Sequence, residues 1–307
     1  MHAISIDIGG TAIKYGLTDE RGRIYWENSS PTPLTSQEAV LDEIMACVQR
    51  VKSANPGLIP ECIGIGTPGL VDITRGYVMG GAGQLPEWEN LPLATIIADA
   101  TGLPVYVDND ANMMALGEYI FGGTPRVANA LFFTIGTGIG GAIIIEGELY
   151  RGSKNAGTEL GCFPWHWEGR WGYWEDFASM KTLTERYNKL CDAGSEIVAT
   201  AKTIFEKLER GERLAHQLVD ENAELIGRGI AGYINIFNPD AIIIGGGISD
   251  SQPNFIEQIK TIAFEHALED CRRGVDFFAA SLGNKAGFVG AGYYALQRFT
   301  QQPGSSG

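Results

Sequence analysis

Two pairs of short apolar runs, each joined by a glycine-rich turn, form the clearest pattern along the chain. The first pair covers residues 3–8 and 12–17, and the second covers 130–135 and 142–145. The runs are rich in β-branched residues and only a few residues join them, so each pair predicts a β-hairpin. The glycines leave each turn almost without side chains.

Elsewhere the apolar positions follow the period of helices or form short buried strands. Helices are predicted at 36–51, 93–101, 111–121, 222–237 and 285–299, with a long helical stretch at 174–219 broken near Gly194. Strands are predicted at 62–66, 104–107 and 241–244, with a further hairpin around 71–78. Strands followed by helices in this order predict an α/β fold with ligand sites at strand ends.

The second half of the chain repeats the order of the first, and no linker rich in proline, serine or charge separates them. We expect one domain at 1–117, completed by a C-terminal helix at about 291–300, and a second at 118–290. The two should pack tightly across a cleft. Residues 301–307, which end in Gly-Ser-Ser-Gly, are expected to be a disordered tail.

Composition narrows the class of protein. The chain has 307 residues, 44% hydrophobic and 20% charged, with no apolar run long enough for a membrane span. Five scattered cysteines without a CxxC spacing favour free thiols in the cytoplasm. The net charge of −14 opposes binding to nucleic acid or an anionic membrane.

The glycine turns suggest the ligand. Bare backbone N–H groups at such turns can bind anionic oxygens. One glycine turn is a weak signal, but two of them suggest two halves that grip one polyphosphate. Because the acidic chain repels free ATP at long range, Mg²⁺ and local backbone dipoles would be needed to hold the nucleotide.

Five motifs in order make the pattern specific. They are Asp7-Ile8-Gly9-Gly10-Thr11, Gly66-Thr67-Pro68-Gly69, Asp108-Asn109-Asp110-Ala111-Asn112 with Ala115-Leu116-Gly117-Glu118, Gly136-Thr137-Gly138-Ile139-Gly140-Gly141, and Gly245-Gly246-Gly247-Ile248. Together they resemble the ROK family of sugar kinases, within the actin-like/hexokinase ATPase superfamily. The resemblance implies two ribonuclease H-like domains around a central cleft. It also implies Mg-ATP-dependent phosphorylation of a hexose or N-acylhexosamine at a primary hydroxyl, at C6, by a protein that we expect to be a homodimer.

Asp110 is the candidate general base. A sugar hydroxyl attacks phosphorus efficiently only when a carboxylate accepts its proton, and Asp110 matches the aspartate with that role in the family. The alternative is that Asp110 caps the helix that begins near Ala111. The resemblance assigns Asn109 to a sugar hydroxyl and leaves Asp108 mostly structural.

Asp7 is expected to hold hydrated Mg²⁺ near the transferring phosphate, or else to bond only its own turn. Lys14 could neutralise phosphate charge or simply face solvent. The remaining candidate nucleotide contacts are Gly9, Gly10, Thr11, Gly136, Thr137 and Gly138 for phosphate, and Gly245, Gly246 and Gly247 for adenosine. For the last three, a plain strand-to-helix turn is the alternative.

The expected sugar contacts are Gly69, Gln84, Asn109, Glu159 and Glu175. Glu175 could instead only favour a helix N-terminus. The resemblance places a histidine where this chain has Cys162, and an asparagine where it has Gln84. Both changes suggest an altered substrate preference, and His166 could replace the missing histidine or lie at the surface.

The family's zinc element is replaced by an aromatic segment. The segment contains Trp165, Trp167, Trp171 and Trp174, and one cysteine with one histidine cannot complete a tetrahedral zinc site. We therefore predict no zinc. The tryptophans could form a local core, or one of them could stack on the sugar.

Three other functions stay open to different degrees. A transcriptional repressor would need a helix-turn-helix ahead of the kinase-like body, whereas only six residues precede Asp7. A catalytically silent sugar-sensing protein is a second alternative, and a β-glucoside kinase a third. Zinc-less relatives of this kind resemble glucokinases and N-acetylmannosamine kinases, so the residues do not select one sugar.

Overall fold

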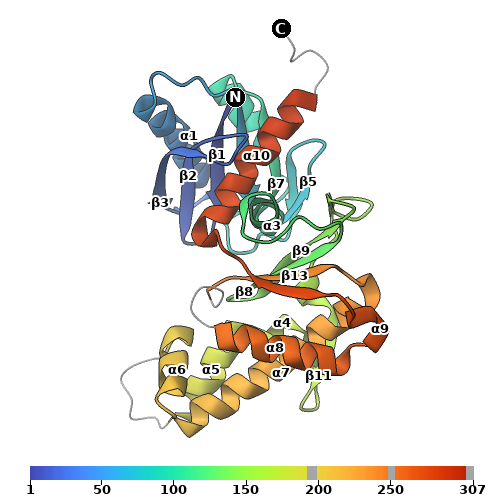
Figure 1. The fold of residues 1–307 in the computed structure, drawn as a ribbon. Helices are drawn as coiled ribbons and strands as arrows, with labels where there is room; N and C mark the ends of the chain where they lie inside the picture. The colour runs from blue at the N-terminus through green and yellow to red at the C-terminus, as the bar shows by residue number, and fades with distance from the viewer. Residues whose placement is uncertain (192–198, 248–252, 302–307) are drawn as a thin grey trace. The chain divides into compact units, whose positions relative to one another are not determined.

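The computed structural model describes residues 1–191, 199–247 and 253–301, and the chain forms two compact units. The first unit comprises Met1–Arg126, Leu149–Thr158 and Asn284–Gly307, and the second comprises Val127–Glu148 and Glu159–Gly283. All of these segments can be followed in Figure 1.

The expected boundary between residues 117 and 118 falls inside helix α3 (Asp110–Phe121). This helix packs along its length on α10 (Ala286–Gln301), so the chain divides after Arg126 instead. All of α10, and not only residues 291–300, belongs to the first unit. Gln301 ends this helix, and the rest of the expected tail lies outside the described residues.

The first unit is built on a five-stranded sheet in the order β3-β2-β1-β4-β7. Its strands are β1 (His2–Ile8), β2 (Ala12–Asp19), β3 (Ile24–Pro31), β4 (Cys62–Thr67) and β7 (Val105–Asn109). β1 to β3 are antiparallel, whereas β4 and β7 run parallel to β1. Strands β5 (Leu70–Asp72) and β6 (Tyr77–Gly80) form the expected small hairpin.

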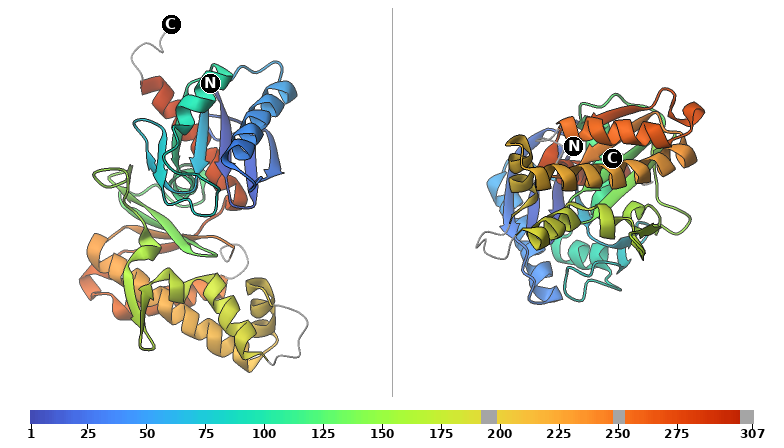
Figure 2. Two further views of the ribbon diagram at one scale, coloured as in Figure 1. Left: turned by 180° about the vertical axis from the view of Figure 1, so that it is seen from behind. Right: turned by 90° about the horizontal axis from the view of Figure 1, so that it is seen from below.

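Helices cover both faces of this sheet. Helices α1 (Gln37–Ala54) and α2 (Leu93–Thr101) lie on one side, and α3 and α10 lie on the other, as the front and back views show (Figures 1 and 2). The alternation along β1 explains the arrangement, because Ile4, Ile6 and Ile8 join the core under α1. Its other face carries small or polar residues, so α10 can approach closely.

The second unit repeats this topology. Its sheet has the order β10-β9-β8-β13-β14, from β8 (Ala130–Ile135), β9 (Ile139–Ile145), β10 (Glu148–Tyr150), β13 (Ala241–Gly245) and β14 (Asp276–Ala279). β9 is antiparallel to β8, and β13 and β14 follow in parallel. Both expected hairpins therefore form, each at the start of an equivalent sheet.

Helices of the second unit pack on this sheet and on one another. They are α4 (Glu175–Ala178), α5 (Met180–Leu190), α6 (Ala201–Glu209), α7 (Arg213–Phe237), α8 (Pro253–His266) and α9 (Glu269–Arg272). The core of the unit joins β8, β9 and β13 to α5, α7 and α8. Among the helices described in either unit, none combines the length and apolar character needed to cross a lipid bilayer.

Several elements differ from the predictions. Helix α7 runs unbroken through 220–222, and the buried Asn222 side chain inside it donates through Nδ2 to Ala178 O at 3.0 Å. The chain turns instead at Gly211, which has a φ of 79°. The break expected near Gly194 lies outside the described residues. Strands β3 and β14 and helices α8 and α9 were not predicted. The reason for β3 is that it is a largely exposed edge strand without apolar alternation.

The aromatic segment forms a β-hairpin that the sequence analysis did not predict. Strand β11 (Pro164–Trp167) pairs with β12 (Arg170–Tyr173), and both residues of the connecting turn have positive φ, as in a type I′ turn. Trp165 and Trp167 pack against the core from one face. Trp171 lies on the opposite face, 73% exposed.

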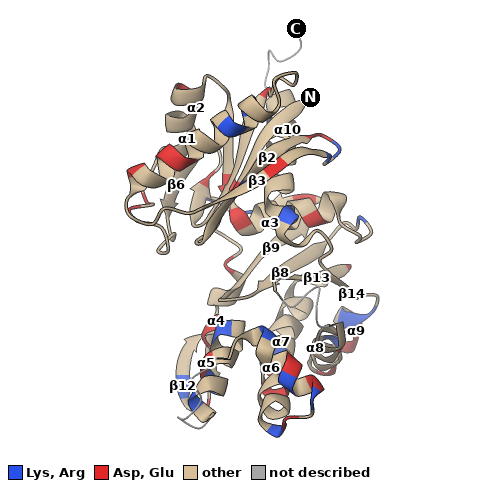
Figure 3. Ribbon diagram, turned by 90° about the vertical axis from the view of Figure 1, so that its left-hand side faces the viewer, with Lys and Arg blue, Asp and Glu red and all other residues tan. Residues whose placement is uncertain are grey.

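Charged residues of both signs are distributed over the two units. Figure 3 shows acidic and basic residues interspersed along the helices of the second unit.

We expect Trp174→Ala to lower the free energy of unfolding by about 3–5 kcal/mol. Trp174 is fully buried and its Nε1 donates to Leu225 O at 2.9 Å, so truncation leaves a cavity and removes this hydrogen bond. Trp171→Ala is the matched control and should change stability by less than about 0.5 kcal/mol. Urea denaturation measures both, and similar losses for the two variants would contradict the assignment of Trp174 to the core.

Candidate active site

Three parallel strands of the first unit carry candidate residues to one edge of its sheet. Asp7 is paired with Gly66 across β1 and β4, and Thr67 is paired with Asn109 across β4 and β7. Parallel strands end at the same edge, and Asp110 begins the helix that follows β7. Asp110 is therefore close enough for its charge to raise the pKa of Asp7.

Burial raises the pKa of both carboxyl groups. The pKa of Asp7 rises from 3.8 to about 7, first through burial and then through the charge of Asp110, while Lys14 opposes the change. The pKa of Asp110 is also raised by burial, against hydrogen bonds from Ala111 and Asn109 that lower it. A carboxylate with a raised pKa accepts a proton readily near neutral pH, as a general base must.

The capping role left open by the sequence belongs to Asn109. Its Oδ1 accepts hydrogen bonds from the backbone N–H groups of Ala111 at 2.9 Å and Asn112 at 3.2 Å. Its Nδ2 donates to Gly69 O at 3.0 Å, which brings together two of the expected sugar contacts. Asp110 is the first helical residue, where helix N–H dipoles favour a negative charge.

The first glycine turn lies against another expected sugar contact. Gly9 N–H donates to Ala12 O at 3.0 Å and closes the turn. A side chain at Gly10 would come within 2.8 Å of Gln84 Oε1, so the Gln84 carboxamide lies over this glycine. Thr11 is exposed at the tip of the turn.

Lys14 is the cross-strand partner of Asp7, and its charge lowers the pKa of that carboxyl group. Its Nζ donates to Asn284 Oδ1 at 3.3 Å. Gly287, near the start of α10, was missed by the sequence analysis. A side chain there would come within 2.6 Å of Asp7 Oδ2, so the N-terminus of α10 lies beside this carboxylate. In the sequence, the only signal for Gly287 is that a glycine stands near the start of a predicted helix.

Glu175 supports the glycine turn of the second unit. Its Oε2 accepts a hydrogen bond from Ile139 N at 2.9 Å, and a side chain at Gly138 would come within 2.5 Å of the same oxygen. Gly136 O accepts a hydrogen bond from Met180 N at 2.9 Å. The Glu175 carboxylate and the first residue of α5 therefore both support the second glycine turn.

Cys162 lies beside the two glutamates expected to contact sugar. Its Sγ donates to Glu175 Oε1 at 3.9 Å, and burial, with the charges of Glu175 and Glu159, raises the pKa of the thiol to about 11. His166 lies on the outer face of β11 against Trp171. In the described part of the chain, no three His, Cys, Asp or Glu side chains are grouped to hold a metal ion.

The third glycine motif lies next to the second turn. Gly245 ends β13, which pairs with β8. Gly246 has a φ of 98°, and a side chain there would come within 2.4 Å of Ile135 O. Gly247 follows, and Ile248 lies outside the described residues. Two of the three glycine motifs thus meet at one edge of the second sheet.

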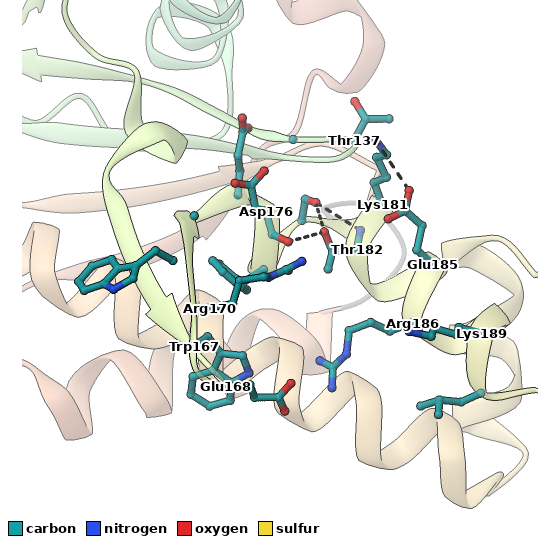
Figure 4. A pocket seen from close by; sticks show the side chains of 17 residues that line it. Thr137, Trp167, Glu168, Arg170, Asp176, Lys181, Thr182, Glu185, Arg186 and Lys189 are labelled. Atoms are coloured by element: carbon teal, nitrogen blue, oxygen red, sulfur yellow. Dashed lines mark hydrogen bonds and ion pairs between the residues drawn. The ribbon is translucent and has the colours of Figure 1, made fainter.

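A pocket of about 810 Å³ opens beside the second turn (Figure 4). Thr137 and Gly138 line one end, and hairpin β11–β12 and helix α5 form walls. Side chains of both signs face it, including Arg170, Asp176 and Lys181. Its size suits a small ligand, and its mixed lining suits a polar one.

Comparisons with known proteins identify the family of the chain. Residues 3–298 match the ROK family. A glucokinase of Streptomyces coelicolor is 35% identical over 94% of this chain and 95% of its own length. A xylose repressor of Caldicellulosiruptor bescii is 30% identical over 84% of this chain and 69% of its own length.

A solved structure gives the same result for the fold. The ROK family glucokinase from Streptomyces griseus, in complex with glucose and AMPPNP, has a TM-score of 0.84 and is 33% identical. The match covers 97% of this chain and 100% of the glucokinase chain.

We expect Asp7→Asn to stabilise the protein at pH 8 in buffer without Mg²⁺ and nucleotide, by on the order of 1–3 kcal/mol. A folded-state pKa raised from 3.8 to about 7 means that stability falls as pH rises through this range. The gain should therefore largely disappear near pH 4, where the carboxyl group is protonated in the folded state and about half protonated in the unfolded state. Urea denaturation at both pH values measures it, with the exposed Asp99→Asn as control. A variant no more stable than wild type at pH 8 would contradict the raised pKa.

Proposed function

The chain belongs to the ROK family and is a sugar kinase, and we propose that it transfers the terminal phosphate of ATP to the primary hydroxyl at C6 of a hexose or N-acylhexosamine. Its α/β fold is of the actin-like/hexokinase ATPase type. The observation that carries the proposal is the pair of neighbouring carboxylates, the buried Asp7 and the partly buried Asp110, at the edge where three parallel strands end.

Asp110 acts as the general base. Burial raises its pKa, so it accepts the proton of the attacking hydroxyl more readily than an exposed aspartate would. The oxygen of that hydroxyl then bonds to the terminal phosphorus, and ADP leaves with the electrons of the broken P–O bond. Asn109, which caps α3, holds the carboxylate at the first turn of the helix.

Asp7 would hold hydrated Mg²⁺. The fit rests on its raised pKa, because a buried carboxylate beside a second carboxylate is stabilised by a cation. Mg²⁺ suits one or two carboxylates together with phosphate oxygens, and it neutralises phosphate charge when bound. Lys14, beside Asp7, adds a fixed positive charge.

The glycine turns bind the nucleotide. Gly9, Gly10 and Thr11 in the first unit, with Gly136, Thr137 and Gly138 in the second, offer N–H and hydroxyl groups to phosphate oxygens. Gly245, Gly246 and Gly247 accept the adenosine end against bare backbone. In support, Gly246 is packed beside the residue that precedes the second turn.

Gly69, Gln84, Asn109, Glu159 and Glu175 recognise the sugar. Gln84 and Cys162 depart from the family pattern, and both lie beside expected contact residues. The sugar preference therefore needs testing: it could be glucokinase-like, N-acetylmannosamine kinase-like or directed at β-glucosides. ADP formation should be compared for glucose, mannose, fructose, N-acetylated hexosamines and cellobiose.

A sugar-sensing regulator is the second candidate, since repressors occur among the relatives. The Asp110 carboxylate and its raised pKa favour catalysis over sensing alone. We also expect a cytoplasmic homodimer that contacts neither nucleic acid nor membrane. Five free cysteines suit a reducing compartment.

We expect Asp110→Asn to lower kcat by about 10²-fold or more, with sugar and ATP binding within several-fold of wild type. The amide keeps the shape of the side chain but cannot accept the proton. Coupled ADP detection and calorimetric binding measure the two effects, with Asp99→Asn as control. Near-normal turnover would show that Asp110 is not the base.

The purified protein should contain no stoichiometric zinc and should keep its activity in a strong chelator once Mg²⁺ is restored. The reason is that one cysteine and one histidine, Cys162 and the outward-facing His166, cannot complete a tetrahedral zinc site. Elemental analysis measures the metal content. One zinc ion per chain would overturn this expectation.

A further inference from the structure

A buried ion pair lies directly behind the candidate catalytic segment. Arg151 Nε donates to Asp108 Oδ2 at 2.8 Å, and Arg151 Nη2 lies 2.6 Å from the same oxygen. The side chains are 16% and 2% exposed, so water screens the pair little. Hydrogen bonds between two charged groups are short and strong.

The other oxygen of Asp108 holds the segment that carries Asp110. Asp108 Oδ1 accepts the backbone N–H of Asn109 at 2.7 Å and the Asn112 side chain, through Nδ2, at 3.0 Å. Asn109 in turn caps α3 at Ala111 and Asn112. One carboxylate therefore fixes residues on both sides of Asp110, and Arg151 fixes that carboxylate.

Arg151 is itself held firmly. Its Nη1 donates to Leu149 O at 3.1 Å, and its guanidinium carbon lies 5.6 Å from the centre of the Tyr294 ring. Gly157 N donates to Arg151 O at 2.9 Å and closes the segment at its far end. These contacts hold the Arg151 guanidinium group in place, and this group in turn holds the Asp108 carboxylate.

The position of Arg151 along the chain is also informative. Residues 149–158 belong to the first unit, whereas the residues before and after them belong to the second. The residue that follows this segment is Glu159, an expected sugar contact. The pair between Arg151 and Asp108 thus anchors in the first unit the segment that leads to Glu159.

We propose that Arg151 is a positioning residue for phosphoryl transfer: through Asp108 and Asn109 it holds Asp110 in line with the sugar hydroxyl. This role rests on the proposed function. Without the guanidinium group, Asp108 is a buried carboxylate without its counter-charge, and the start of α3 loses a fixed support. Displacement of a reacting group by about 1 Å can lower a rate about 10²-fold.

The test is Arg151→Ala, with kinetics and hydrogen exchange on the full chain. We expect kcat to fall about 10- to 100-fold while KM for ATP changes less than about threefold. Added guanidinium ion, far below unfolding concentrations, should restore part of kcat, and methylammonium should restore less because it lacks the planar fork. Amide exchange at Asn109 and in the first turn of α3 should accelerate.

Arg50→Ala is the matched control. Arg50 pairs with Glu43 at 2.6 Å in the same unit, but it is 45% exposed and belongs to α1, so its loss should leave kcat unchanged. Should Arg151→Ala not fold, Arg151→Lys keeps the charge without the fork and should show a smaller loss of kcat. Asp108→Asn should lose kcat without any response to guanidinium.

Full kcat in Arg151→Ala would overturn the proposal. So would a loss without rescue in which amide exchange accelerates equally throughout the first unit, because that result indicates a purely structural role. The exchange measurement also separates this inference from the proposed function. If the wild type phosphorylates no sugar, the proposed function is wrong. Faster amide exchange confined to residues 108–112 in Arg151→Ala would still support the link from Arg151 to the start of α3.

Discussion

The closeness of two carboxylates, the buried Asp7 and the partly buried Asp110, is the constraint on which the rest of the site depends. The loss of water around each raises both pKa values, and the charge of Asp110 adds to the effect on Asp7. Such an arrangement destabilises the apo protein at neutral pH. We infer that the protein keeps the two carboxylates together because the binding of a cation and phosphate, and the transfer of a proton, offset this loss of stability.

The two sheets have one topology but different chemistry. Each begins with an antiparallel hairpin followed by parallel strands. In the first, a carboxylate precedes the glycine turn, whereas in the second Thr134 stands at the equivalent place and Glu175 supports the turn from outside the sheet. Proton transfer and cation binding are thus proposed for the first unit, and phosphate contacts for both.

Sequence alone predicted the elements whose signal is local. The two hairpins, the strands that lead to Asp7 and Asp110, and the α/β class follow from apolar spacing and glycine turns. The β11–β12 hairpin was missed because its alternating tryptophans were interpreted by size rather than by period. Arg151 was missed because its partner, Asp108, lies 43 residues away along the chain, and only the fold brings them together.

Phosphorus NMR of the product tests the central claim most directly. With Mg-ATP and an accepted hexose, we expect one new phosphomonoester resonance coupled to the two methylene protons at C6. The corresponding 6-deoxy sugar should give none. A resonance coupled to the anomeric proton, or ADP formation that is unchanged by removal of the 6-hydroxyl, would contradict transfer to the primary hydroxyl.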